Sequence, residues 1–281
     1  MSVVKKMKSI LRPYPFVYKI SHNFWCFLKS IFSFRNLRII VLDDWVLDEG
    51  LPEKMVSDPG YNSVIDDLLV FTGLSREHLY DRLVRKPRTM THYRSEFKWH
   101  APKDINELAW FYRCSYSHLF CNASHPYWTK LDFLTPDVGR VLDYAAGVGN
   151  NVIELAERGF EVDYLEINII QEAFTRFRAG RRGLKNLNFI SPVVNGKLDP
   201  IGCIKSTYGA IILQDILEHV PDYQVLLSHL IDHLKLGGYI IESSPLEEGK
   251  DEIDIHLKQT VPIETAMKGM KRLKENIWQK T

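Results

Sequence analysis

The stretch that decides the fold is Val-Leu-Asp-Tyr-Ala-Ala-Gly-Val-Gly, at residues 141–149. Its apolar start predicts a strand, and a helical run begins at Asn150. Gly147 and Gly149 stand between the two, where a residue without a Cβ lets the chain turn sharply and a ligand come close. The first turn of the next helix offers unpaired N–H groups to a polar ligand. A strand, a small-residue turn and a helix start together predict a nucleotide-type binding site.

The following segment narrows the type of nucleotide. Residues 160–165 alternate apolar and polar side chains and predict a second strand, with Glu166 at its end, 19 residues after Gly147. A carboxylate there is placed to accept both hydroxyls of a ribose. The dinucleotide pattern needs a small residue where this chain has Val152, and an acid at Asp143 is foreign to it.

Together these residues resemble the class I S-adenosylmethionine-dependent methyltransferases, whose first motif runs acid-x-Gly-x-Gly-x-Gly. The acid and the three small positions are matched here by Asp143, Ala145, Gly147 and Gly149. Glu166 matches the ribose-binding acid of the family. Residues 209–220 are similar to the family's fourth strand with its Leu-Glu-His loop, and residues 234–242 to the Gly-Gly turn into its fifth strand. The resemblance covers roughly residues 137–245.

Strands and helices alternate from residue 137 onward, which predicts an α/β fold with a mostly parallel, doubly wound, Rossmann-like sheet. Right-handed crossovers place the ligand outside the carboxyl ends of the strands. The family sheet closes with an antiparallel hairpin, for which residues 253–258 and 273–279 are the candidates. The other expected strands lie near residues 140–144, 160–165, 187–190, 209–213 and 239–243, and the helices near 150–158, 168–179, 222–235 and 262–268.

The pattern divides the chain into three parts. Residues 1–45 form a basic, aromatic, amphipathic segment, residues 46–135 an N-terminal helical cap, and residues 136–281 the cofactor-binding domain. Two short amphipathic helices are expected in the cap, at 63–74 and 75–85, before a longer one that follows a capping box at 104–107. We expect the cap to help close the substrate pocket.

The basic surplus belongs to the N-terminus alone. Residues 1–42 hold eight Lys or Arg and no acid, so of the 36 basic residues 28 remain for the rest of the chain against 35 acids, a net charge of −7. A general nucleic-acid binder would carry a basic excess, so no nucleic-acid partner is expected. A basic helix followed by aromatic sequence is also typical of a membrane interface, while packing on the protein core is the alternative.

The cysteine pattern is typical of a protein in a reducing compartment. Cys26, Cys114, Cys121 and Cys203 form no Cys-x-x-Cys pair, so neither a disulfide framework nor a metal site is predicted. No cleavable signal pattern and no membrane-length apolar segment are evident. The expected location is the cytoplasm, with peripheral contact to the inner face of the membrane as the further option.

The resemblance implies S-adenosyl-L-methionine as the cofactor. Asn168 is expected to contact the ribose or the adenine of the cofactor, and the alternative is that it caps the N-terminus of the next helix. Ser191 stands where the family often has an acid that binds adenine, so either Ser191 or backbone groups serve there. The cofactor-binding residues that we expect are Asp143, Ala145, Gly147, Gly149, Asn150, Glu166, Asn168, Ser191, Gln214 and Asp215.

The catalytic and substrate-binding candidates rest on position. Asp215 follows the fourth strand, and His219 lies in the loop after it, where a histidine can remove a proton from a hydroxyl or amine. His256 is a comparable candidate from the C-terminal segment. A loop-shaping role for the Leu-Glu-His stretch is the alternative. Substrate contacts are expected from one stretch of the cap, with ordinary packing as the alternative: Tyr112, Arg113 and Tyr116.

The expected function is methyl transfer from S-adenosylmethionine to a small-molecule, sugar or lipid-linked acceptor, on oxygen or nitrogen rather than carbon. The loop after the fourth strand, residues 214–217, lacks the Asn/Asp-Pro-Pro-aromatic sequence of DNA amino methyltransferases, and no cysteine follows a proline as in cytosine-carbon methyltransferases. Two alternatives stay open: a catalytically degenerate scaffold with this fold, and a nicotinamide-dependent oxidoreductase.

Overall fold

The computed structural model describes residues 59–76, 79, 119, 122–123, 131–244, 257, 259 and 261–281. The chain divides into two compact units, Met1–Asp43 and Asp44–Thr281, and all described residues belong to the second. Within them no helix has both the length and the apolar character that crossing a bilayer requires.

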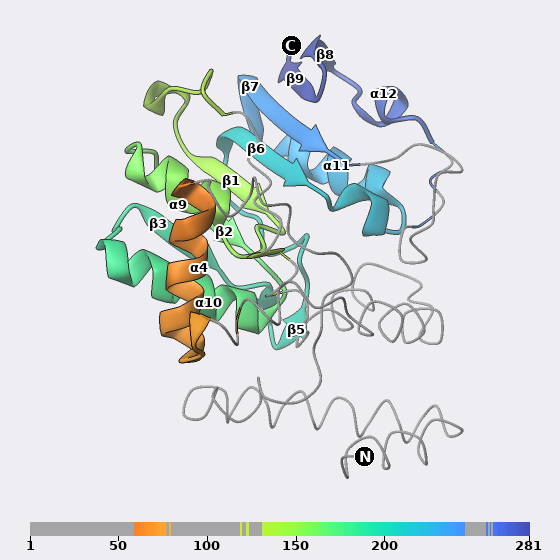
Figure 1. Cartoon of the computed structure of the whole chain (residues 1–281). Coiled ribbons are helices and arrows are strands. Elements are labelled where there is room, and N and C mark those ends of the chain that lie inside the picture. The colour runs from red at the N-terminus through yellow and green to blue at the C-terminus, as the bar shows by residue number, and fades with distance from the viewer. Residues whose placement is uncertain are drawn as a thin grey trace, which may run out of the picture. The chain divides into compact units, whose positions relative to one another are not determined.

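The centre of this unit is a seven-stranded sheet with the order β3-β2-β1-β6-β7-β9-β8 (Figure 1). The two remaining strands, β4 and β5, form a separate antiparallel hairpin. The strands are β1 Val141–Tyr144, β2 Val162–Leu165, β3 Leu187–Ile190, β4 Val193–Val194, β5 Lys197–Leu198, β6 Tyr208–Gln214, β7 Leu234–Ser243, β8 Met270–Lys274 and β9 Ile277–Lys280.

The strand order defines where a ligand belongs. β1 pairs in parallel with β2 on one side and with β6 on the other, and β7 continues the parallel sheet beyond β6. The chain therefore adds β2 and β3 on one side of β1, and then crosses to the other side of β1 to add β6 and β7. In such sheets the ligand crevice lies at the carboxyl ends of the strands on either side of the reversal, here β1 and β6.

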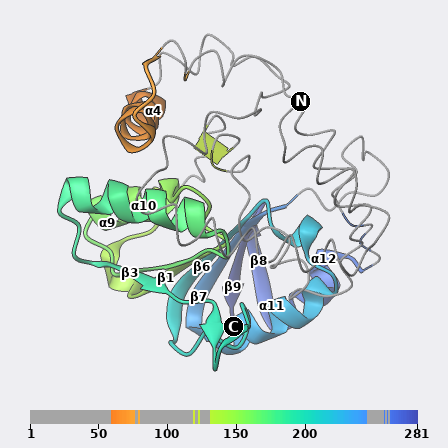
Figure 2. The same cartoon turned by 90° about the horizontal axis from the view of Figure 1, so that it is seen from below.

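Helices cover both faces of the sheet (Figure 2). The helices α9, Asn150–Glu157, and α10, Ile169–Arg182, lie on one face. On the other face lie α11, Tyr223–Asp232, and the short α12, Ile263–Ala266. Two turns of 3-10 helix, η1 at Pro136–Val138 and η2 at Leu217–His219, join elements of the domain.

Strand β6 shows how the sequence builds this layering. Ile211 and Leu213 belong to the apolar core on the α11 side, and Ala210 and Ile212 to the core on the α9 side. Alternate side chains of one strand point to opposite faces, so a strand buried on both faces is apolar throughout. The predicted Rossmann-like fold is therefore confirmed.

Several predicted boundaries are wrong. The expected helix 222–235 ends at Asp232, and the expected helix 168–179 continues to Arg182. Strand β7 begins at Leu234 rather than near 239, and its register with β6 shifts between Tyr208 and Ala210. The stretch 273–279 is not one strand: it contains the turn between β8 and β9, where Asn276 adopts a φ of 64°. Both strands are antiparallel to their neighbours, as the family hairpin requires.

The predicted cap is described only in part. Helix α4, Pro59–Thr72, begins four residues before the expected start at 63, with a proline in its first turn, where the missing N–H costs no hydrogen bond. It packs against α10 (Figure 1). The expected helices at 75–85 and after 104–107 lie outside the described residues except for single positions.

Candidate functional site

The turn between β1 and α9, residues 145–149, is called the glycine loop below. Gly147 and Gly149 have positive φ values of 54° and 75°. Ala145 also has a positive φ, of 59°. A Cβ on Gly149 would lie 2.3 Å from Cγ2 of Thr175, so that position needs glycine for space as well as for conformation. Ala145 adopts the same left-handed conformation with its methyl group in place, which is why a glycine is usual there.

Glu166 ties the glycine loop to the end of β2. One carboxylate oxygen accepts the Gly147 N–H at 2.8 Å, and the other accepts the Asn168 N–H at 2.8 Å. The side chain is buried, and burial raises the pKa of Glu166 to about 7 against the opposing effect of the backbone N–H groups of Asn168, Gly147 and Ile167. A carboxylate has about four lone-pair sites, so Glu166 can still accept a ligand donor.

Asn168 has the capping role that the sequence offered as its alternative. Its side-chain oxygen accepts the N–H groups of Ile170 and Gln171 at the start of α10, at 2.9 and 3.3 Å. These bonds satisfy two N–H groups of the first helical turn. They also fix the point where the chain leaves Glu166, so Asn168 shapes the site through the backbone.

Asp143 lies at the end of β1 and is 2% exposed. Burial raises its pKa to about 8, which a hydrogen bond with Asn151 opposes and the nearby Glu166 reinforces. Among the described residues, its Oδ2 atom and the Oδ1 atom of Asn151 have no hydrogen-bond partner. Two buried acceptors without donors are costly, and they mark a place where a ligand with N–H or O–H groups fits.

The carboxyl end of β6 contacts the first turn of α9. Gln214 accepts a hydrogen bond from Nδ2 of Asn151 at 3.2 Å, which joins this strand to the first turn of α9. Asp215 follows in a left-handed conformation with a φ of 47°. Gln214 and Asp215 therefore lie at the sheet edge that we expected, next to the glycine loop.

The loop after β6 buries an acid beside the candidate base. Glu218 is buried in η2, and its Oε1 atom lies 3.7 Å from Nε2 of His219. Burial raises the pKa of Glu218 to about 8, with Asp215 and Glu242 adding to the effect. Glu218 is thus mostly protonated at neutral pH and places little negative charge beside His219.

Two further residues expected to bind the cofactor, Asn150 and Ser191, make side-chain contacts within the protein. The Asn150 side chain accepts a hydrogen bond from Arg178 at 2.8 Å on the α10 side of the loop. The Ser191 hydroxyl, exposed after β3, accepts the Val193 N–H at 3.2 Å in a local turn. His256 and the three cap residues at 112, 113 and 116 lie outside the described residues.

Sequence reasoning missed two side chains that hydrogen-bond to the glycine loop, Tyr164 and Arg178, and a third, Asn122, that lies beside it. Tyr164, on β2, donates its hydroxyl to the Gly147 carbonyl at 2.7 Å. Asn122 donates to Oε1 of Gln171 at 2.7 Å, close to the position of a Cβ on Gly147. Arg178 donates to the Val148 carbonyl at 2.5 Å. For Arg178 a signal was present, because it extends the buried stripe of α10 at helical spacing.

Comparison with known proteins settles the family. The family model described as a methyltransferase domain matches residues 117–271, more than half of the chain. The protein belongs to this family, which confirms the resemblance found in the sequence. Among the described residues no three potential metal-ligating side chains gather.

Individual similarities are more limited. The putative methyltransferase YqeM of Bacillus subtilis (strain 168) is 41% identical over 54 residues, which are 19% of this chain and 22% of that protein. TehB from Haemophilus influenzae superposes with a TM-score of 0.41 and 17% identity over 51% of this chain and 49% of its own. The O-methyltransferase domain of StiE, residues 942–1257, gives a TM-score of 0.34 and 22% identity, covering 40% and 39% of the two chains.

Proposed function

We propose that the protein uses S-adenosylmethionine to methylate a small-molecule, sugar or lipid-linked acceptor, on oxygen or nitrogen rather than carbon. The observation that carries this proposal is the pair of buried carboxylates, Asp143 and Glu166, on the two sides of the glycine loop in a chain of the methyltransferase domain family. We assign Glu166 to the hydroxyl donors of the ribose and Asp143 to a group with several N–H donors.

The side chains of the site fit the cofactor because they have acceptor oxygens that can still take hydrogen bonds from it. Glu166 can accept a ribose hydroxyl in addition to the backbone N–H groups that it already accepts. The unpartnered oxygens of Asp143 and Asn151 suit the ammonium group of the methionine part, which has three donors. Ala145, Gly147 and Gly149 bring the backbone close without side chains in the way.

When bound, the cofactor supplies an activated methyl group whose sulfonium leaves as a neutral thioether. The protein's task is to hold the acceptor atom in line and to exclude water. We place this step at the carboxyl end of β6, beside Gln214 and Asp215. An acceptor that carries a proton needs a base, and His219 is our first candidate because Glu218 beside it is mostly protonated at neutral pH. His256 remains the alternative base.

The parts before the sheet receive their roles from the sequence pattern. We propose that residues 46–135 cover the substrate pocket, with Tyr112, Arg113 and Tyr116 toward the substrate. We also propose that residues 1–42 bring the protein to the cytoplasmic membrane surface, since this segment contains eight Lys or Arg and no Asp or Glu. Sedimentation with anionic vesicles tests this: changing Lys5, Lys6 and Lys8 to Glu should release the protein, and undiminished sedimentation of the variant would refute membrane contact.

Calorimetric titration of the full chain tests the cofactor. S-adenosylhomocysteine should bind, NAD should not, and Glu166→Gln should weaken the binding. Glu161→Gln, an exposed acid just before β2, is the matched control and should bind normally. Transfer of labelled methyl groups into cell extracts then tests the reaction. Binding of NAD alone would support the oxidoreductase, and binding of neither compound would support a scaffold.

A further inference from the structure

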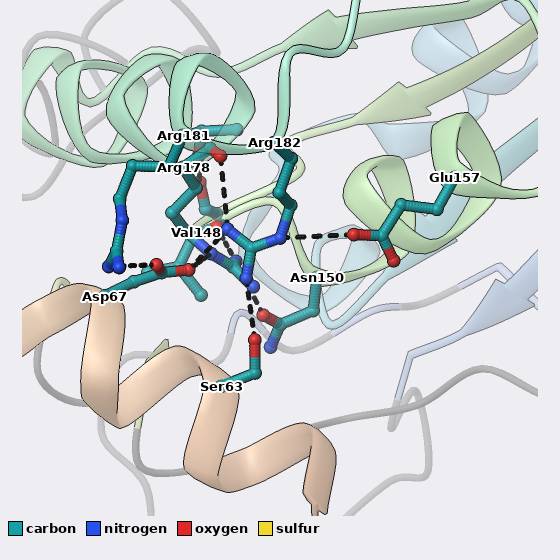
Figure 3. Close-up of polar contacts among 10 residues, drawn as sticks. Ser63, Asp67, Val148, Asn150, Glu157, Arg178, Arg181 and Arg182 are labelled. Carbon is teal, nitrogen blue, oxygen red and sulfur yellow. Dashed lines mark hydrogen bonds and ion pairs between the residues drawn. The ribbon is translucent and has the colours of Figure 1, made fainter.

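Helix α4 carries a buried carboxylate that three arginines surround. Asp67 lies on the face of α4 toward α10 and is 3% exposed. Its oxygens lie 3.2 Å from Nε of Arg178, 2.8 Å from Nη1 of Arg181 and 2.7 Å from Nη1 of Arg182 (Figure 3). An acid that is this buried keeps its charge only when it is paired and hydrogen-bonded.

Arg178 is the arginine with a second task. It is as buried as Asp67, and its guanidinium lies between Asp67 on α4 and the Val148 carbonyl of the glycine loop (Figure 3). Nη1 donates to the Val148 carbonyl at 2.5 Å and to Oδ1 of Asn150 at 2.8 Å. Burial lowers the pKa of Arg178 to about 10, which Asp67 opposes, so the cation persists at neutral pH. One charged group therefore bridges α4 and the loop.

The other two arginines also bind Asp67 and connect it to further side chains, and Arg182 shares the Oδ2 atom of Asp67 with Arg178. Arg182 donates to the Ser63 hydroxyl at 2.6 Å and lies 3.2 Å from the Glu157 carboxylate. Arg181 is about half exposed and contacts Asp67 alone among the acids. Apolar contact adds to the attachment of α4, since the Phe71 ring lies 5.1 Å from that of Phe174 on α10.

We propose that Asp67 and Arg178 are positioning residues that couple the docking of α4 to the shape of the glycine loop. The ligand is the one assigned in the proposed function, on which this inference rests. Without Asp67 the guanidinium of Arg178 is a buried cation that lacks its counter-ion, and it moves toward water. The carbonyl of Val148 and the amide of Asn150 then lose their donor, and the loop loses the support that holds its left-handed residues. By linkage, a ligand that needs the loop in this shape strengthens the docking of α4 by the same factor.

Amide hydrogen exchange of the full chain is the first test and needs no variant. Adding S-adenosylhomocysteine should slow exchange in peptides from residues 59–72 on α4. If the wild-type protein binds the ligand and exchange in α4 is unchanged, the coupling is refuted while the proposed function stands. If the wild-type protein binds no S-adenosylhomocysteine, both fail.

The variant test uses two neighbouring acids of α4. Asp67→Asn should weaken S-adenosylhomocysteine binding by about tenfold or more and abolish the ligand-dependent protection of α4. Asp66→Asn is the matched control: Asp66 pairs with Arg76 at 2.7 Å, and both side chains are more than half exposed. It should change neither quantity. Equal behaviour of the two variants would overturn the inference.

A milder variant guards against loss of folding. Arg181→Gln removes the outer contact to Asp67 and leaves the Arg178 bonds to the loop in place. It should raise the basal exchange of α4 and weaken ligand binding in the same direction as Asp67→Asn, by a smaller factor. In turnover, both variants should raise the KM for S-adenosylmethionine and leave kcat nearly unchanged. A fall in kcat at constant KM would place these residues in some other role.

Discussion

The pH dependence of cofactor binding follows from the surroundings of Glu166. Its pKa is raised to about 7 by burial, and the ionised form can accept a ribose hydroxyl because neither oxygen carries a proton. About one molecule in eleven has this group ionised at pH 6, and about ten in eleven at pH 8. Glu166 alone should therefore make S-adenosylhomocysteine bind about tenfold more tightly at pH 8 than at pH 6, or ~1.4 kcal/mol.

Asp143 acts in the same direction. Its pKa is raised to about 8 by burial, and a ligand ammonium favours its ionised form. Binding at pH 7 should thus release protons from both groups, and the affinity of the wild-type protein should rise more steeply than Glu166 alone predicts. Glu166→Gln separates the two contributions, because the slope that remains belongs to Asp143.

Isothermal titration at pH 6, 7 and 8, in buffers of different ionisation enthalpy, measures affinity and proton release together. The wild-type protein should bind more tightly as pH rises, and Glu166→Gln should bind more weakly at pH 8 with a shallower slope. Glu161→Gln should follow the wild type. An affinity that is flat or falls from pH 6 to pH 8 would refute the reasoning, and an unchanged slope in Glu166→Gln would remove Glu166 from the ligand contacts.

Three further predictions concern stability. Gly149→Ala forces a Cβ to within 2.3 Å of Thr175 and should cost roughly 2–3 kcal/mol by thermal denaturation, whereas Gly159→Ala, with open space around it, should cost only the roughly 1 kcal/mol of its left-handed backbone. Similar losses in both would refute the steric argument. Tyr164→Phe removes the hydroxyl donated to the glycine loop and should cost about 1 kcal/mol in urea denaturation; an unchanged midpoint would contradict this. The buried carboxylates of the site have pKa values raised to about 7 or 8, so the ligand-free native state holds more protons than the unfolded chain above about pH 4. The free energy of unfolding should therefore fall as pH rises from about 4 to 8, and a Tm that increases over this range would contradict the assignment.

The sequence predicts the glycine loop and Glu166 because their arrangement is local. A strand, its turn and the next helix follow one another within residues 141–166, and the periodicity of each is readable in the chain. The adjacent asparagines show where this reasoning ends. Helix α9 begins at Asn150, which turns that side chain toward Arg178 and turns Asn151 toward Gln214. A shift of one residue in the helix would exchange their roles, and sequence patterns do not locate helix boundaries that closely.

Arg178 illustrates a limit of another kind. It precedes two further arginines by a few positions, a pattern typical of a solvated helix end with favourable charge. Its partner Asp67 lies 111 residues earlier, in a helix whose docking depends on apolar contacts with α10. Only the folded chain brings the two together. The amphipathic spacing of α10 places Arg178 in the buried stripe, but the spacing carries no information on what neutralises it.

The charges beside the glycine loop also distinguish between the two ligands that the sequence suggested, S-adenosylmethionine and a dinucleotide. Asp143 and Glu166 lie at the ends of adjacent parallel strands; burial raises the pKa of both, and Glu166 adds to the rise for Asp143. A dinucleotide would bring its anionic pyrophosphate to the glycine loop beside Asp143, where the ionised carboxylate would repel it. A ligand with a cationic amino-acid end and a ribose lacks that phosphate and supplies donors to both groups. The ionised carboxylate of Asp143 thus favours a nucleoside with a cationic amino-acid end over an anionic dinucleotide.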